Sequence, residues 1–401
     1  MDGDPVIEPE VDVDGFSRVL PLPYRVAVII VLGVWAWGCN LHYLQLVKID
    51  VPSLIRYPSR TSPTHISHHR STYRLATLIS LPLAASLLLF WAVTRGDPAS
   101  IRSWELLPNL YLLVLVICFF LPFHIFSGSG RSRFLATLKR ISIGGIAEAQ
   151  DGRFGDILMA DALTSYAKVL GDLFISLCMF FSPGRSSTGT PDRTCGGLFV
   201  VPFIIAVPST IRLRQCLIEF GRVRNANKRA GHIGSHGWGG QHLANALKYS
   251  TAFPVIILSA LQRGYDPEKM GMSEAGLFRL WLLFVFINSF YSFYWDIAKD
   301  WDLSLFSKHR DSPEHPWGLR RHRYFHADNL YYTAMVIDLF LRCTWSFKLS
   351  PHLDHFNDLE GGIFTMEVLE VFRRWMWIFF RVETEWGRSQ MSVALQKSKL
   401  K

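Results

Sequence analysis

Long apolar stretches recur along almost the whole chain of 401 residues. Each runs for about 17 to 22 residues, close to the roughly 20 that a helix needs to cross a bilayer. Because they leave little room for a soluble domain, we expect an all-α polytopic membrane protein, a bundle of about nine or ten transmembrane helices. The nine predicted spans are Tyr24–Leu44, Leu75–Val93, Leu107–Phe126, Ile157–Phe181, Leu198–Leu213, Leu243–Leu261, Leu277–Ala298, Leu330–Phe347 and Ile363–Phe380.

Basic residues gather in every second connection between these spans, and the remaining connections are neutral or acidic. Because Lys and Arg resist translocation, the basic connections should be cytosolic and the others lumenal or exterior. This alternation predicts a lumenal N-terminus and a cytosolic C-terminus, unless a tenth helix lies within Phe134–Ala149. It also accounts for the net charge of +9, so we expect no nucleic-acid partner. The basic connections are 48–74, 131–140, 212–229 and 308–323, and the others are 95–105, 182–197, 262–274 and 348–360.

The six cysteines indicate neither a disulfide framework nor a zinc site. Cys39, Cys118, Cys178 and Cys343 lie inside predicted spans, Cys195 lies in a loop, and no C-x-x-C motif occurs. The first residues are acidic, whereas a signal peptide begins with basic residues. We therefore expect the first span to be a retained membrane anchor.

Charged side chains occur inside several of the apolar spans. Each one costs at least ~2.5 to 3.5 kcal/mol at the bilayer centre, so it needs a partner or a hydrated cavity. Internal ion pairs, such as Asp338 with Arg342, would satisfy some of them, but the whole set favours a polar central cavity. The set comprises Asp161, Ser165, Lys168 and Asp172 on one expected helix face, Lys248 with Tyr249, Asp296, Asp300, Asp338, Arg342, Glu367, Glu370, Arg373, Arg374 and Arg381.

These buried charges suit a small anion. Arg presents a planar fork of donors that matches two phosphate oxygens, and Lys presents a compact positive charge. Carboxylates can pair with these cations when the site is empty and keep the affinity low enough for release. We therefore predict a transporter for inorganic phosphate that is not an enzyme and requires no metal or cofactor.

Six short strings stand in a characteristic order over roughly residues 110–388: Gly155–Ser165, Ile211–Leu217, His242–Ser250, Tyr291–Trp301, Leu341–Trp345 and Phe372–Arg381. In order and spacing they resemble the EXS-domain family of phosphate exporters. Larger members carry an N-terminal SPX domain that senses inositol polyphosphates, and no such domain is expected before Tyr24. The chain thus resembles the short fungal ER-retention-defective branch.

The resemblance implies a division of the chain and a set of site residues. The divisions are an acidic lumenal tail at 1–23, N-terminal transmembrane helices at 24–126, an EXS-type transport domain at 127–388 and a basic cytosolic tail at 389–401. Thr164 stands where other members can carry Asn. The implied phosphate-binding residues are Asp161, Lys248, Tyr249, Asp296, Asp300, Arg342, Arg373 and Arg374, with Trp345 as gate and Ser165, Lys168, Asp172, Asp338 and Glu370 as supporting residues.

The branch that the chain resembles implies a cellular role. It implies a multi-pass Golgi protein that returns phosphate, released by lumenal glycosylation, to the cytosol and so supports retention of Golgi glycosyltransferases and ER residents. Lys397 and Lys399 have the spacing of a coat-protein retrieval signal, which predicts cycling with the ER and partners in coat-protein or glycosyltransferase-sorting machinery. The sequence leaves open whether passage is channel-like, whether protons are coupled and whether the chain forms a homodimer.

Two other functional classes compete with transport. A sorting scaffold that retains glycosyltransferases would have no need of a hydrated charged pathway. A membrane di-iron desaturase or hydroxylase would use histidines spaced as in His65–His69 and as in His322 with His326. A third histidine box is missing, because Phe356 follows His355, and surface histidines in basic loops are the simpler interpretation.

Overall fold

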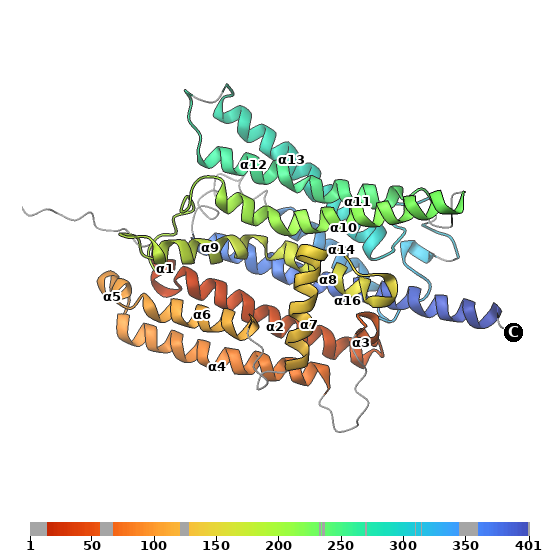
Figure 1. The fold of residues 1–401 in the computed structure, drawn as a ribbon, viewed down its shortest axis with the longest axis horizontal. Helices are drawn as coiled ribbons and strands as arrows, with labels where there is room; N and C mark the ends of the chain where they lie inside the picture. The colour runs from red at the N-terminus through yellow and green to blue at the C-terminus, as the bar shows by residue number, and fades with distance from the viewer. Residues whose placement is uncertain are drawn as a thin grey trace, which may run out of the picture.

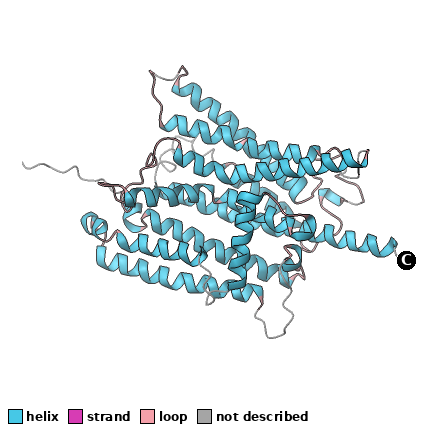
Figure 2. Ribbon diagram, viewed as in Figure 1, coloured by secondary structure: helices cyan, strands magenta, loops and turns pink. Residues whose placement is uncertain are grey.

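The structure is a computed structural model that describes residues 14–56, 67–120, 128–231, 234, 237–268, 271–308, 310–313, 315–344 and 360–399. Throughout these residues the regular structure is helical and no strand occurs, as Figure 2 shows. The prediction of an all-α bundle is therefore confirmed.

The helices follow one another with short connections, and several lie nearly parallel in Figure 1. They are α1 (Gly15–Val19), α2 (Leu22–Leu46), α3 (Val51–Leu54), α4 (His68–Thr94), α5 (Pro98–Ser103), α6 (Leu106–Phe120), α7 (Gly128–Lys139), η1 (Arg140–Gly144), η2 (Ala149–Asp151), α8 (Arg153–Ser165), α9 (Ala167–Phe181), α10 (Val200–Ala230), α11 (Gly240–Ser250), α12 (Ala252–Arg263), α13 (Glu274–Trp295), η3 (Asp296–Asp300), η4 (Pro316–Gly318), α14 (Asp328–Arg342) and α16 (Glu360–Lys399).

Five helices of the described chain are long and apolar enough to cross a membrane: α2, α4, α10, the joined α11–α12, and α13 with η3. The bent pair α8–α9 would make a sixth. The predicted count of nine or ten rests on three further segments that differ from a simple apolar span. Of these, α6 has only 15 residues, and α14 and α16 carry several charges. Helix α7, in the segment that could have held a tenth span, has 12 residues and runs across the neighbouring helices in Figure 1.

The predicted span at 157–181 is not one straight helix, because the chain bends by 60° between α8 and α9. The bend falls at Tyr166, whose hydroxyl lies where a Cβ at Gly33 of α2 would collide with it. Glycine is therefore required for this close approach. The bend also breaks the single face expected for four residues, because Asp161, Ser165 and Asp172 are buried whereas Lys168 is exposed.

The connections sort to the two ends of the bundle. In Figure 1, α1, α5 and the loop after α9 lie at the left end, and α3 and the C-terminal part of α16 lie toward the right. The neutral or acidic connections 95–105 and 182–197 thus share one end, as the charge pattern predicts. The compartment that each end faces stays a prediction.

The expectation of no disulfide is wrong, because Cys178 and Cys195 are bonded to each other. Cys178 lies in the last turn of α9, and Cys195 lies in the loop that follows it. The 17-residue separation in sequence closes a loop at the left end of Figure 1. Disulfides persist in oxidising compartments such as the lumen of the secretory pathway.

We expect the Cys178→Ser/Cys195→Ser double variant to unfold more easily than the parent. In the chain-entropy account, a disulfide that closes a loop of this length raises the free energy of the unfolded chain by about 3 kcal/mol. Thermal unfolding of the detergent-purified protein measures the effect, with Cys118→Ser as control because Cys118 is a free cysteine. Equal midpoints for the double variant and the control would contradict the expectation.

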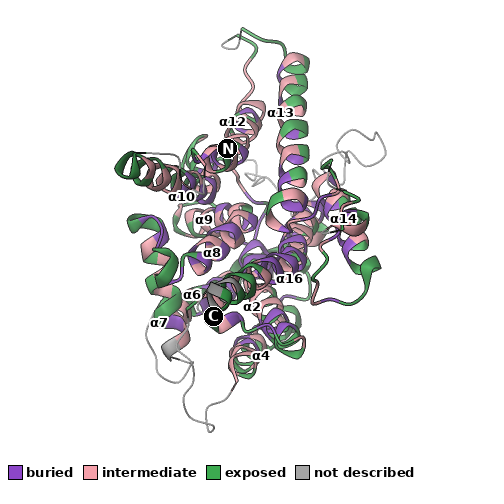
Figure 3. Ribbon diagram, turned by 90° about the vertical axis from the view of Figure 1, so that its right-hand side faces the viewer, coloured by how far each residue is buried: buried purple, intermediate pink, exposed green. Residues whose placement is uncertain are grey.

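Helix α16 runs through the middle of the bundle, and Figure 3 views it close to end-on among α2, α8, α9 and α14. It packs against α2, α8 and α14. Toward its C-terminal half lies an aromatic core in which Trp301 and Trp377 are fully buried. A second core around Tyr24 and Phe90 joins α2 to α4 and α6. Because α16 is surrounded on most sides there, several of its charged residues, among them Arg373, Arg374 and Arg381, are turned into the protein interior.

Candidate functional site

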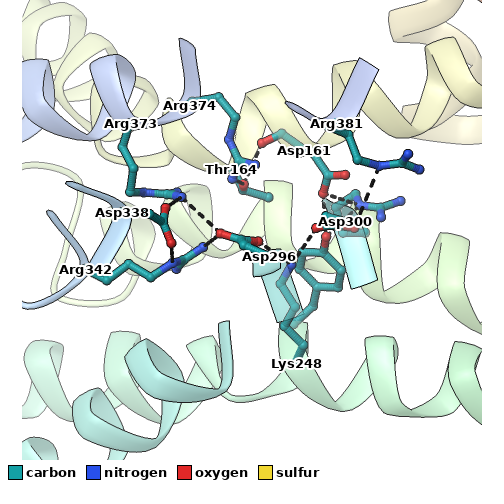
Figure 4. Close-up of polar contacts among 12 residues, drawn as sticks. Asp161, Thr164, Lys248, Asp296, Asp300, Asp338, Arg342, Arg373, Arg374 and Arg381 are labelled. Carbon is teal, nitrogen blue, oxygen red and sulfur yellow. Dashed lines mark hydrogen bonds and ion pairs between the residues drawn. The ribbon is translucent and has the colours of Figure 1, made fainter. Parts of the chain in front are cut away.

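Charged residues from six elements meet around the middle of α16. Helix α8 supplies Asp161, α10 supplies Arg212, α11 supplies Lys248 and Tyr249, η3 supplies two aspartates, α14 supplies Asp338 and Arg342, and α16 supplies its own charged face. Figure 4 shows most of them. We call this set the central cluster; its members are Asp161, Arg212, Lys248, Tyr249, Asp296, Asp300, Asp338, Arg342, Glu370, Arg373, Arg374 and Arg381.

Asp296 contacts three cations of the central cluster. It is fully buried at the start of η3, where the helix widens to π geometry. Its Oδ2 accepts a hydrogen bond from Arg342 and lies 3.4 Å from Nη1 of Arg373. Its Oδ1 lies 3.6 Å from Nζ of Lys248, as Figure 4 shows. One carboxylate thus joins cations from α11, α14 and α16.

Arg373 is held by three carboxylates. Its Nε and Nη2 donate to the two oxygens of Glu370 at 2.9 and 2.6 Å, and its Nη1 lies 3.2 Å from Oδ1 of Asp338. Asp338 also accepts from Nε of Arg342 at 3.2 Å, so the predicted pairing of Asp338 with Arg342 is present. Arg373 therefore ties α14 and η3 to α16 and has its charge fully compensated.

Arg374, the next residue, has different surroundings. It is buried, and its Nε and Nη2 donate to the hydroxyls of Ser165 at 2.8 Å and Thr164 at 3.1 Å. Its guanidinium also lies over the ring of Trp377, 4.6 Å from the centroid. Among the described residues, no carboxylate oxygen lies within 4.0 Å of it. A guanidinium has five N–H donors, so three remain for another acceptor.

Lys248 is also loosely held. Its Nζ lies 3.6 Å from Oδ1 of Asp296 and 3.6 Å from Oδ2 of Asp300, both longer than a direct N–H···O hydrogen bond. The ammonium lies 5.0 Å from the ring centroid of Tyr249. Asp300 is shared with Arg381, whose Nε lies 3.8 Å from its other oxygen. Spacing of this kind leaves the three ammonium donors free to bind water or an anion.

Sequence reasoning missed Arg212, which lies within the central cluster. Its Nε donates to Oδ1 of Asp161 at 2.7 Å, and Tyr249 donates to the same oxygen. The positive-inside pattern placed Arg212 in a cytosolic connection, but α10 continues to Ala230 and buries it. Its place in the string Ile211–Leu217 was the one signal that could have identified it.

Other predicted residues lie elsewhere. Asp172 is buried in a second group of charges, where its Oδ1 lies 3.0 Å from Arg193. The gate residue Trp345 lies outside the described residues. Helix α16 runs through Lys397 and Lys399, whose side chains are not described. Within the described part of the chain, no group of three or more His, Cys, Asp and Glu side chains is arranged to hold a metal ion.

Fold and site together define a multi-pass helical membrane protein built around a buried cluster of charges. The chain belongs to the EXS family, whose sequence profile matches residues 20–387. The family resemblance inferred from the six strings is thereby confirmed.

Curated relatives agree with this family. Over 393 residues the chain is 29% identical to Protein ERD1 homolog 2 of Schizosaccharomyces pombe, covering 91% of this chain and 96% of the relative. It is 30% identical over 397 residues to Protein ERD1 of Kluyveromyces lactis, covering 93% and 96%. It is also 25% identical over 375 residues to Phosphate transporter PHO1 of Arabidopsis thaliana, covering 90% of this chain and 42% of that protein. The last name describes transport rather than catalysis.

Proposed function

We propose that this protein transports inorganic phosphate across the Golgi membrane from the lumen to the cytosol. The observation that carries the proposal is Arg374, a buried guanidinium with free donors and no described carboxylate oxygen within 4.0 Å. An unpaired buried cation is costly unless an anion joins it. Phosphate offers several acceptor oxygens that match the arginine fork.

The remaining cations of the central cluster have carboxylate partners that an anion must compete with. Lys248 is the most loosely paired of them, at 3.6 Å from both aspartates, so it is the second cation that we expect phosphate to bind. Arg342 and Arg373 pair closely with Asp296 and Asp338, and these pairs set the affinity by competition. A site that binds weakly releases its ion quickly, which transport requires.

Two further observations support the proposed orientation of the protein in the membrane. The disulfide between Cys178 and Cys195 favours an oxidising compartment for the end of the bundle that holds it. The basic connections lie in segments that the positive-inside pattern assigns to the cytosol. The resemblance to the ER-retention-defective branch, which the ERD1 relatives support, implies a Golgi role in which returning phosphate to the cytosol assists retention of glycosyltransferases and ER residents.

Replacing Lys248 tests the path through the cluster. We expect Lys248→Met to lower labelled-phosphate uptake into liposomes by about tenfold or more, because one charge-assisted contact to phosphate contributes ~1.5 to 3 kcal/mol. Asp296 keeps two arginines and Asp300 keeps Arg381, so folding should survive. Lys299→Met is the matched control, since Lys299 is an exposed lysine of the same η3 segment.

Uptake by the two lysine variants is compared at equal amounts of inserted protein. Lys299→Met should transport at the parent rate. Uptake by Lys248→Met that equals uptake by Lys299→Met would show that phosphate does not pass Lys248.

A further inference from the structure

A row of ionisable residues follows one face of α16. Glu360, Glu367, Glu370, Arg374 and Arg381 are separated by seven, three, four and seven residues, which places them on the same side of a helix. Glu370 and the two arginines belong to the central cluster. Glu360 begins the helix, and Glu367 lies between these two levels.

Around Glu360 lies a second group of charges, which we call the outer network. Arg25 of α2 donates to Glu360 at 2.5 Å and to Ser17 at 2.7 Å. Arg193, from the loop closed by the disulfide, lies 3.1 Å from Glu360 and 3.0 Å from Asp172. Each of these charges therefore has an opposite charge in direct contact.

Glu367 differs from every member of the outer network. Its residue surface is 3% exposed, and its buried Oε1 has no hydrogen-bond partner among the described residues. No cation of the described chain lies within 4.0 Å of its carboxyl group. The charges that act on it from a greater distance are Arg25 of α2, Lys168 and Asp172 of α9, and Arg193 of the loop.

These surroundings favour the neutral acid over the carboxylate. The two arginines nearest in the network already neutralise Glu360 and Asp172, and Lys168 is exposed. A buried carboxylate without a partner is costly, whereas binding a proton removes the charge. The carboxyl group also stands on the face of α16 that leads from the outer network to Arg374.

We propose that Glu367 is a proton-binding site and that one proton crosses on it with each phosphate. The carboxylate takes a proton from the solution on the disulfide side and becomes the neutral acid, and the acid later releases that proton to the opposite side. A monobasic phosphate and this proton carry no net charge together, which lowers the cost of crossing a low-dielectric region. This inference rests on the proposed phosphate transport.

The test measures how far a pH difference drives phosphate accumulation. Liposomes containing the parent or Glu367→Gln are given a difference of about one pH unit, with the membrane potential held at zero by potassium and valinomycin. The plateau of labelled phosphate is converted to a ratio of monobasic phosphate across the membrane. Plateau ratios depend on stoichiometry and not on rate or on the orientation of the protein, so a slower variant is still informative.

In the parent we expect about tenfold more monobasic phosphate on the alkaline side, because one coupled proton contributes a tenfold ratio per pH unit. In Glu367→Gln the ratio should be about one, and Glu367→Asp should restore the parent value. A monobasic-phosphate ratio of one in the parent, or of about ten in Glu367→Gln, would overturn the proposal that Glu367 carries the proton. Neither result would contradict the proposed phosphate transport. Phosphate exchange at equal pH is measured first, and its absence in folded parent protein would overturn the proposed function as well.

Discussion

Arg374→Ala is expected to reduce phosphate transport by about 10- to 100-fold while the protein stays folded. Removing a charged donor costs ~1.5 to 3 kcal/mol of phosphate binding, which corresponds to that range of affinity. The substitution leaves no carboxylate of the described chain without its ion-pair partner, because Arg374 donates to the neutral hydroxyls of Ser165 and Thr164. Uptake of labelled phosphate at several concentrations separates weaker binding from slower turnover.

The variant Arg374→Lys tests whether phosphate transport needs the planar guanidinium or only a positive charge. Lysine keeps the positive charge but cannot present a planar fork, so its transport should lie between the parent and Arg374→Ala. The thermal midpoints of the three proteins should lie close together. If Arg374→Ala takes up phosphate at the parent rate with equal amounts of inserted protein, Arg374 does not bind the transported phosphate.

Arg373→Ala is expected to have a different outcome although it changes the neighbouring residue to the same side chain. Arg373 compensates Glu370, Asp338 and Asp296, and breaking the buried pairs with the two aspartates costs ~3 to 5 kcal/mol. We expect loss of folded protein, seen as a lower yield of monodisperse material and a lower thermal midpoint.

The adjacent arginines therefore serve as controls for each other. Both are buried on α16, and they differ in whether a described carboxylate lies within ion-pair distance of the guanidinium. A stable Arg373→Ala protein with normal phosphate uptake would show that the ion pairs around Asp338 contribute little. Equal destabilisation by both substitutions would show that Arg374 is a structural residue.

The sequence predicted the composition of the central cluster better than its contacts. Charges within apolar spans are expensive, so their presence alone indicated that Lys248, Asp296 and Arg342 face the interior. The four-residue spacing of Asp338 and Arg342 also predicted their pairing, because such residues are neighbours on a helix. The spacing of the residues could not show that Arg373 contacts three carboxylates. It also could not show that Arg374 contacts hydroxyl groups instead.

Other errors have physical causes that a local pattern does not contain. The bend between α8 and α9 depends on the packing of Tyr166 against Gly33, two residues far apart in the chain. The bond between Cys178 and Cys195 depends on the loop folding back to the end of α9. Arg212 was assigned to a connection because charge alone does not tell where α10 ends.

The most direct test of the account is phosphate exchange by the purified parent protein in liposomes. We predict saturable exchange of labelled phosphate that depends on the protein and falls sharply in Arg374→Ala. No exchange by folded, correctly inserted parent protein would contradict the account and favour a sorting role without transport.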